Sequence, residues 1–322
     1  MTNPDPDAVV AMRRFSRRSG VPDIAQVPGG RLIDLPGRGR TYVVDIPGPE
    51  GAPTLILLHA TACTGYLTWF PALDALAERY RVIVFDQRWH GRGIRSARFS
   101  VLDCADDVVA IADALGVKRA ILAGYSLGGV VALLAAHRHP DRMSGLVLCA
   151  TPYRFQEKLR ERAFHLTFGA LAAAIGPYSY RRAEEHAGQL SDMPEHTWAP
   201  GQLNRWALNE FRSNSGWAMT QVIAEVGRFD STAWLSTLTM PTAVVITTRD
   251  RAIPVYRQLE MATMIPGASI HLVKAGHASC VLEADRFVPV LLEACAAVAT
   301  RRAKTSNAAL FGGDGEQGSG VG

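Results

Sequence analysis

The 322-residue chain lacks the features that mark several classes of protein. Its five cysteines are an odd number and include no C-x-x-C pair, so we expect buried thiols in a reducing compartment rather than a disulfide framework. The longest apolar run, around residues 166–175, is about half as long as the ~20 residues that a membrane-spanning helix needs. Residues 1–20 contain no apolar stretch long enough for a secretory signal. We therefore predict a cytoplasmic protein without a transmembrane segment.

An excess of charge of either sign is also missing. The formal net charge is only +4, and much of the positive excess lies in the arginines between residues 13 and 18. A balance this mild gives no reason to expect nucleic-acid binding by the body of the protein. The basic stretch 12–18 allows weak contact with an anionic membrane surface, but the simpler interpretation is a mobile N-terminal arm over residues 1–30.

What the chain does contain is a regular alternation of short apolar runs with helical patterns. Two alternating runs around a Pro-Gly-Arg-Gly turn at 36–39 predict a hairpin. Helices are expected at 67–80, at 104–115 with Asp103 as N-cap, at 255–264 and at 286–298. The predicted strands are 31–35, 42–46, 54–59, 81–85, 120–123, 145–149, 242–247 and 269–273. This alternation predicts an α/β fold, with a mostly parallel sheet and helices on both of its faces.

The alternation stops between residues 152 and 230. That segment has no strand-like run, and its helical sequence is interrupted at Gly176-Pro177 and at Met193-Pro194. We interpret it as a helical cap inserted into a core formed by residues 31–151 and 231–302. The segment 303–322 is rich in Gly and Ser and poor in apolar residues, which predicts a disordered tail.

One serine lies in a pattern with chemical meaning. Residues 124–128 read Gly-Tyr-Ser-Leu-Gly, which fits G-x-S-x-G, between the strand at 120–123 and a small-residue helical pattern at 130–136. A serine at a tight strand-to-helix turn adopts a strained backbone angle and presents its hydroxyl above the sheet. The N-terminus of the following helix favours a developing oxyanion. The pattern identifies Ser126 as a candidate nucleophile, the alternative being a structural serine in a turn.

A serine needs a base, and the base needs a carboxylate that orients it. Catalytic groups of parallel sheets follow the carboxyl ends of strands. Asp250 follows the strand at 242–247 and His277 follows the strand at 269–273. The order Ser126, Asp250, His277 is the one expected for a hydrolase of this architecture. Asp230 is a weaker alternative for the acid.

These residues and their surroundings resemble the α/β-hydrolase-fold serine hydrolases with a helical cap, the group of esterases, lipases and C–C hydrolases. The likeness extends over residues 32–298. Its motifs are LLHAT at 57–61, FDQRWHGRG at 85–93, GYSLGG at 124–129, RDRAIP at 249–254 and AGH at 275–277. The resemblance implies an eight-stranded sheet, with Ser126 as nucleophile, His277 as general base and acid, and Asp250 as the orienting acid. It implies neither a cofactor nor a metal.

The resemblance also implies an oxyanion hole made of two backbone N–H groups. One belongs to Leu127, and the other comes from the loop after residues 57–59, where we assign it to Thr61. Two departures from the family pattern affect the surroundings. His59 is followed by Ala60 where the family usually has glycine, which leaves the choice of second amide open. Glu283 lies six residues after His277 rather than five, so its role is shifted.

The other candidate residues have simpler interpretations. His59 and His90 are expected to brace backbone, and the H-x-H at His137 and His139 is expected to be solvated, without ligand spacing for a metal. Cys63 and Cys280 are expected to line a pocket without being reactive.

The cap has many large apolar side chains, most of which should pack on the cap helices and the core, while some should line a dry pocket above the serine. They are Phe155, Phe164, Phe168, Leu171, Trp206, Phe211, Trp217 and Met219.

The preferred hypothesis is therefore a carboxylic ester hydrolase that acts on a small apolar acyl or aryl ester, as a monomer or homodimer. The same triad would serve a C–C bond hydrolase, a thioesterase or amidase, or a perhydrolase. A serine nucleophile argues against epoxide hydrolases and haloalkane dehalogenases, which use a carboxylate. A non-catalytic ligand-binding protein on the same fold is the alternative from another class.

Overall fold

The computed structural model describes residues 29–191 and 202–311. Its strands form one eight-stranded sheet in the order β1-β2-β4-β3-β5-β6-β7-β8. β1 pairs antiparallel with β2 and β2 antiparallel with β4, while the remaining pairs are parallel. The strands are β1 (Arg31–Leu35), β2 (Gly39–Ile46), β3 (Thr54–Leu58), β4 (Arg81–Phe85), β5 (Ala120–Tyr125), β6 (Met143–Cys149), β7 (Thr242–Thr247) and β8 (Ser269–Val273). The predicted mostly parallel α/β sheet is confirmed.

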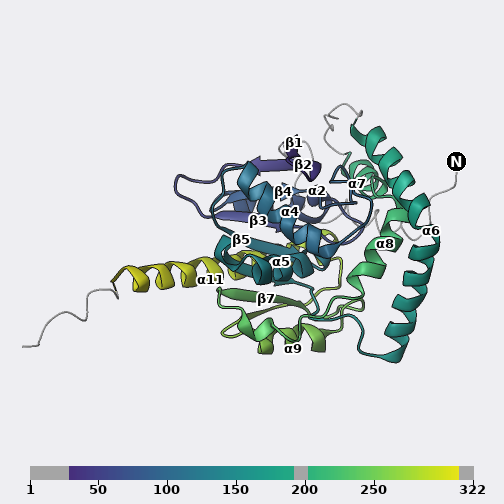
Figure 1. Cartoon of the computed structure of the whole chain (residues 1–322). Helices are drawn as coiled ribbons and strands as arrows, with labels where there is room; N and C mark the ends of the chain where they lie inside the picture. The colour runs from purple at the N-terminus through teal and green to yellow at the C-terminus, as the bar shows by residue number, and fades with distance from the viewer. Residues whose placement is uncertain (1–28, 192–201, 312–322) are drawn as a thin grey trace, which may run out of the picture.

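Helices cover both faces of this sheet, as the alternation predicted (Figure 1). Successive residues of a strand point to opposite faces, so the buried strands supply two separate cores. One core packs against α4 (Val101–Ala114), α5 (Leu127–Arg138) and α9 (Val255–Met264). The other packs against α2 (Gly65–Trp69), α3 (Leu73–Ala77), α10 (Ser279–Leu282) and α11 (Ala284–Phe311).

Two expectations about helix boundaries are wrong. The helix expected at 67–80 is divided into α2, the 3₁₀ turn η2 (Phe70–Ala72) and α3. The interruption falls at Pro71, which has no N–H to donate and whose ring crowds the preceding turn. The N-cap of α4 is Ser100, not Asp103, because the Ser100 hydroxyl accepts the hydrogen bond from the Asp103 N–H. Asp103 lies inside the first turn instead.

Between β6 and β7 the described residues form the α-helices α6 (Leu159–Ser191), α7 (Leu203–Arg212) and α8 (Gly216–Val226), followed by the 3₁₀ turn η4 (Leu235–Thr237). The long α6 runs beside α8 at one end of the molecule (Figure 1). The break expected at Gly176-Pro177 is wrong, because α6 continues through both residues. The break at Met193-Pro194 lies outside the described residues. The division of the chain into core and cap stays a prediction.

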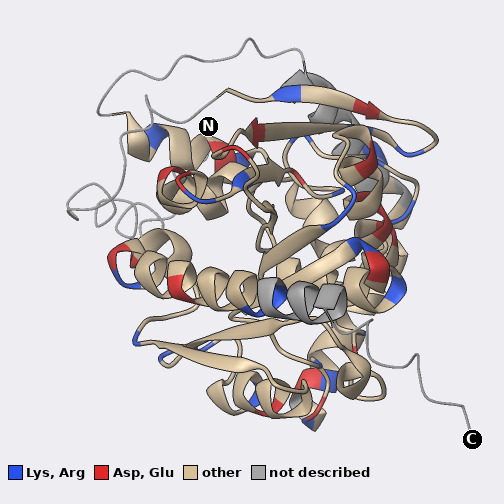
Figure 2. Cartoon of the chain, turned by 90° about the vertical axis from the view of Figure 1, so that its left-hand side faces the viewer, with Lys and Arg blue, Asp and Glu red and all other residues tan. Residues whose placement is uncertain are grey.

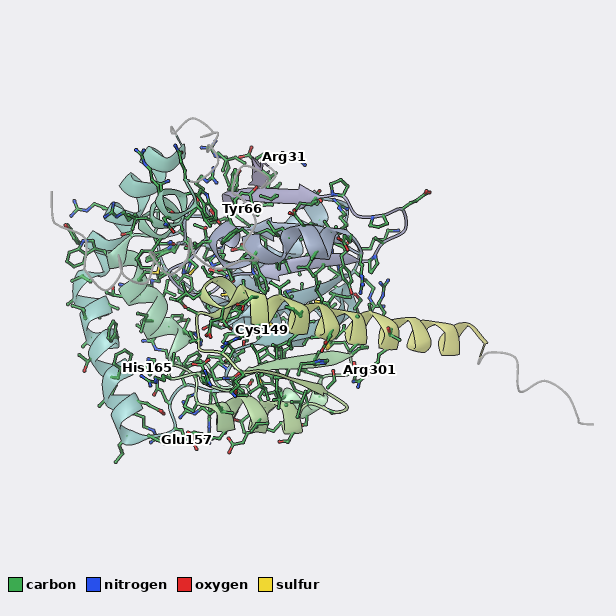
Figure 3. All side chains as sticks on the ribbon, turned by 180° about the vertical axis from the view of Figure 1, so that it is seen from behind. Arg31, Tyr66, Cys149, Glu157, His165 and Arg301 are labelled. Atoms are coloured by element: carbon green, nitrogen blue, oxygen red, sulfur yellow. The ribbon has the colours of Figure 1, made fainter. Side chains whose placement is uncertain are left out.

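Salt bridges attach the segment before α6 and its first turn to the core. Arg257 on α9 bonds through Nη2 to Glu157 at 3.1 Å and to Glu161 at 2.6 Å. Glu157 lies just ahead of α6, and His165 lies further along the helix (Figure 3).

The apolar side chains of this segment are less buried than expected. Trp206 and Met219 are buried, but four others expose 43–51% of their surface: Phe164, Leu171, Phe211 and Trp217. Half of the eight side chains are therefore left largely uncovered by the described residues.

At the C-terminus, α11 continues to Phe311, so residues 303–311 are helical and not the start of a disordered tail. The sequence of that stretch contains Ala, Lys and Leu, which favour helix. The rest of the predicted tail, and residues 1–28 of the predicted arm, lie outside the described residues. No helix in the described ranges combines the length and hydropathy needed to cross a membrane. Basic and acidic residues are interspersed over the face seen in Figure 2.

Candidate active site

Ser126 lies on the turn between β5 and α5, with φ 53° and ψ −111°. A non-glycine residue with these backbone angles is strained, and the strained turn persists because the packing around it prevents another backbone conformation. The two glycines of the motif are required by close backbone approach. A Cβ on Gly124 would lie 2.2 Å from the Gly128 carbonyl oxygen, and a Cβ on Gly128 would lie 2.0 Å from the Leu58 carbonyl oxygen. The motif thus packs the start of α5 directly against the end of β3.

The structure brings the three residues of the predicted triad together. His277 Nε2 lies 3.1 Å from Ser126 Oγ, and His277 Nδ1 lies 2.7 Å from Asp250 Oδ2. Asp250 and His277 follow the carboxyl ends of β7 and β8, as predicted. The Asp250 carboxyl is fully buried, whereas 29% of the imidazole is exposed. Solvent or a small molecule can therefore reach the ring edge while the carboxylate stays dry.

Asp250 is held by hydrogen bonds to both of its oxygens. Oδ1 accepts the N–H groups of Ala252 and Ile253, each at 2.8 Å, and Oδ2 also accepts the Thr247 hydroxyl at 2.8 Å. Burial by itself would raise the pKa of Asp250, but the bond from His277 and these further donors hold that pKa below its ordinary value. Asp250 therefore remains a carboxylate and keeps the proton of the imidazole on Nδ1. The alternative acid, Asp230, instead accepts the Thr232 N–H at 2.9 Å.

Backbone contacts fix the position of His277. The Tyr125 hydroxyl donates to the His277 carbonyl at 2.6 Å, and Glu283 Oε2 accepts the Gly276 N–H at 2.8 Å. Tyr125 is the variable residue before the serine, and sequence reasoning gave it no role. The shifted Glu283 thus holds the residue that immediately precedes the histidine.

The two predicted oxyanion donors have free N–H groups. Within the described residues, neither the Leu127 amide nor the Thr61 amide donates a hydrogen bond. The neighbouring amides are occupied, because Ala60 N–H donates to the Thr68 hydroxyl and Cys63 N–H donates to the Ala60 carbonyl. Within the described residues, the loop therefore leaves the amides of residues 61, 62 and 64 without an acceptor.

His59 braces this loop, as expected. Its Nε2 accepts the Gln87 N–H at 2.8 Å and its Nδ1 donates to the Ala60 carbonyl at 2.8 Å. Burial lowers the pKa of His59, which keeps the ring neutral and able to accept at Nε2. His90 is likewise buried, and its Nδ1 donates to the Arg88 carbonyl at 3.0 Å.

The remaining candidates are structural. Burial raises the pKa of Cys63 to about 11 and also raises that of Cys280, so both stay protonated at neutral pH. The H-x-H pair is not simply solvated: His137 stacks on Trp234 and His139 bonds to Asp106 at 2.8 Å. No group of three His, Cys, Asp or Glu in the described ranges is arranged to hold a metal ion.

Comparison with known proteins places the chain in a family. Residues 53–284 match the model of the alpha/beta hydrolase fold family. A protein of Variovorax paradoxus named "Putative carbamate hydrolase RutD" is 33% identical over 271 residues, which are 79% of this chain and 96% of that protein.

Solved structures share the fold. The enol-lactonase of Burkholderia xenovorans superimposes with a TM-score of 0.66 at 20% identity, over 83% of this chain and all of that one. An esterase of Exiguobacterium antarcticum gives a TM-score of 0.65 at 22% identity, over 82% of this chain and 98% of that one. The chain belongs to the alpha/beta hydrolase fold family.

Proposed function

We propose that this protein is a serine hydrolase that cleaves carboxylic esters with an apolar acyl or aryl group. The observation that carries the proposal is the continuous chain of hydrogen bonds from Ser126 Oγ through the His277 ring to the buried carboxylate of Asp250. In this arrangement the hydroxyl has a base within proton-transfer distance, and the base has a fixed tautomer.

In the first half of the reaction, Ser126 Oγ attacks the ester carbonyl carbon while its proton moves to His277 Nε2. The resulting imidazolium is stabilised by Asp250, to which Nδ1 donates. The negative charge on the former carbonyl oxygen is held by the N–H groups of Leu127 and Thr61. His277 then returns the proton from Nε2 to the leaving alkoxide, which departs as the alcohol and leaves the acyl group on Ser126.

The second half repeats these steps with water. His277 Nε2 removes a proton from the water as its oxygen attacks the acyl carbon, and the second tetrahedral intermediate forms in the same oxyanion hole. Return of the proton to Ser126 Oγ releases the carboxylic acid and restores the enzyme. Each oxyanion donor is worth about 3 to 4 kcal/mol of the barrier, so the two free amides make a large contribution.

Carbamates form a second candidate substrate class. Two relatives, 33% and 31% identical to this chain, are named as putative carbamate hydrolases and are matched over 96% and 92% of their own length. A carbamate has the same carbonyl centre, and its leaving amine takes a proton from His277 where an ester's alkoxide would. Lactones require no further machinery, since the ring oxygen is then the leaving group.

The test is hydrolysis of a panel of short and medium p-nitrophenyl esters, aryl carbamates and lactones by the full-length chain. Ser126→Ala should lower turnover of the best substrate by on the order of 10⁴-fold or more. Ser144→Ala is the matched control, because Ser144 is also a buried serine but lies on β6. A Ser126→Ala variant with near wild-type turnover would refute the proposal.

A further inference from the structure

Helix α7 contacts the loops that border the candidate active site. Trp206, buried on α7, packs edge-to-face against Phe70 with ring centroids 4.9 Å apart. This contact places the end of α7, and the turn that follows it, beside α2 and the loop of residues 60–64, which we call the oxyanion loop. Two polar residues of this region then bond directly to the loop.

Asn214, in the turn after α7, joins two loops. Its Nδ2 donates to the Ala62 carbonyl at 3.2 Å, and its Oδ1 accepts the Gly91 N–H at 3.1 Å. Ala62 has a φ of 58°, which is strained for a residue with a Cβ, whereas Gly91, at 42°, adopts positive φ freely. Strained backbone persists only where surrounding contacts hold it. The amide of Asn214 provides such a contact to Ala62 and ties it to the loop of Gly91.

Glu210, near the end of α7, bonds to the other end of the oxyanion loop. Its Oε2 accepts the Thr64 hydroxyl at 2.5 Å. The same Thr64 Oγ1 accepts the Leu67 N–H at 3.1 Å and so caps α2. Glu210 therefore bonds to the residue that joins the oxyanion loop to its helix, while Asn214 bonds to the middle of the loop.

The charged groups around Glu210 come from two neighbouring elements. Asp86, after β4, faces it and accepts the N–H groups of Gly65 and Arg92, each at 2.9 Å. Arg92 is the nearby cation, and its guanidinium lies over the Tyr42 ring. Tyr66 on α2, labelled in Figure 3, interacts electrostatically with the same three groups. Burial first, and then Asp86, raise the pKa of Glu210 to about 7.

We propose that Glu210 and Asn214 are positioning residues of the active site, which hold the oxyanion loop in the conformation that presents its free amide, and that they do so best while Glu210 is protonated. This inference rests on the proposed function. A neutral Glu210 adds no charge beside Asp86 and keeps its contact with Thr64. An ionised Glu210 accepts a stronger bond from Thr64 and is attracted to Arg92, but burial and repulsion from Asp86 outweigh both. The second buried negative charge therefore strains the contact of α7 with the loop and opposes the negative charge that develops on the oxyanion.

The test is the dependence of kcat and KM on pH, from about pH 5 to about 9, with an uncharged ester as substrate. In the wild type, titration of Glu210 should produce a several-fold decline of kcat above about pH 7. Glu210→Gln stays neutral and can still accept from Thr64, so the decline should disappear. Glu225→Gln is the matched control and should keep the wild-type profile, because Glu225 is a partly exposed glutamate on α8 that pairs with Arg228.

Asn214→Ala should lower kcat by roughly 10-fold at every pH with little change in KM, because the misplaced amide matters mainly in the transition state. Identical pH profiles for Glu210→Gln and the wild type would overturn the proposed role of Glu210. An Asn214→Ala variant with wild-type kcat would overturn the role of Asn214.

Hydrogen exchange separates failure of this inference from failure of the proposed function. Amides of residues 61–65 should exchange faster in Asn214→Ala than in the wild type, whether or not an ester is turned over. If Ser126 proves inert but the loop amides still exchange faster, the proposed function fails and the contact holds. If the enzyme is active and exchange is unchanged, the positioning role is refuted and the function stands.

Discussion

Replacing Gly128 with alanine tests the claim that backbone contact between α5 and β3 shapes the serine turn. The added Cβ would lie 2.0 Å from the Leu58 carbonyl oxygen and 2.9 Å from the Leu58 Cβ. Ordinary van der Waals contact begins at 3.4 Å, so the closer of these distances is too short by about 1.4 Å. The clash is with main chain at the end of a central strand, and no side chain can rotate away from it.

The expected cost has two parts. Overpacking of this kind destabilises proteins by about 1 to 3 kcal/mol, and the rigid neighbour at Gly128 places it at the upper end. Relief of the clash must also shift either the Ser126 turn or the end of β3, from which the oxyanion loop begins. Misplacement by about 1 Å costs on the order of 100-fold in rate. We therefore expect a loss of about 3 kcal/mol in the free energy of unfolding and a fall in kcat of roughly 100-fold.

Urea unfolding and ester hydrolysis measure the two effects separately. Gly169→Ala is the control, because Gly169 lies inside α6 with nothing within 4 Å of an added Cβ. That variant should be stabilised by up to about 1 kcal/mol, the difference in helix propensity, and should keep its activity. A Gly128→Ala protein with wild-type stability and wild-type kcat would refute the account of the turn.

Three further predictions follow from the described contacts. Asp250→Asn should lower kcat by about 10⁴-fold in ester assays, because His277 loses the carboxylate that fixes its tautomer. The circular dichroism signal should be unchanged, and a variant with wild-type activity would contradict the prediction. Arg88→Ala removes the bidentate partner of the buried Asp107 carboxylate, which keeps only its bond from Arg38. The substitution should cost about 2 kcal/mol in guanidinium unfolding, and a cost below about 0.5 kcal/mol would refute this. Between about pH 4.5 and 7 the folded wild type retains a proton on Glu210 that the unfolded chain has lost. The free energy of unfolding of the wild type should therefore fall relative to that of Glu210→Gln as the pH rises. If the two unfolding free energies instead changed in parallel with pH, this prediction would be contradicted.

The sheet was predictable because most of its strands are buried on both faces, so that their sequences are continuous apolar runs. The predicted strands lie within a few residues of the observed ones, and the chain order of Ser126, Asp250 and His277 followed from the rule that catalytic groups come after strand ends. Features of the site that depend on residues close in sequence could also be predicted. The glycines around Ser126 belong to that class, and their necessity is explained by backbone distances.

Contacts between distant segments could not be predicted in this way. Glu210 and Thr64 are 146 residues apart, and neither belongs to a motif that indicates their pairing. The sequence also did not tell which proline would interrupt a helix. Pro71 does so, whereas Pro177 lies inside the long α6. The exposed Phe164, Leu171 and Trp217 show the same limit, because hydrophobicity alone did not tell which side chains the fold would cover.

Labelling with a fluorophosphonate tests the central claim most directly, because the reagent reacts with a serine only when an adjacent base and an oxyanion hole activate it. The folded chain should gain one adduct, mapped to Ser126 by peptide mass spectrometry, and unfolded chain should gain none. Folded protein that stays unlabelled at Ser126, or that is labelled there equally well after unfolding, would contradict the account.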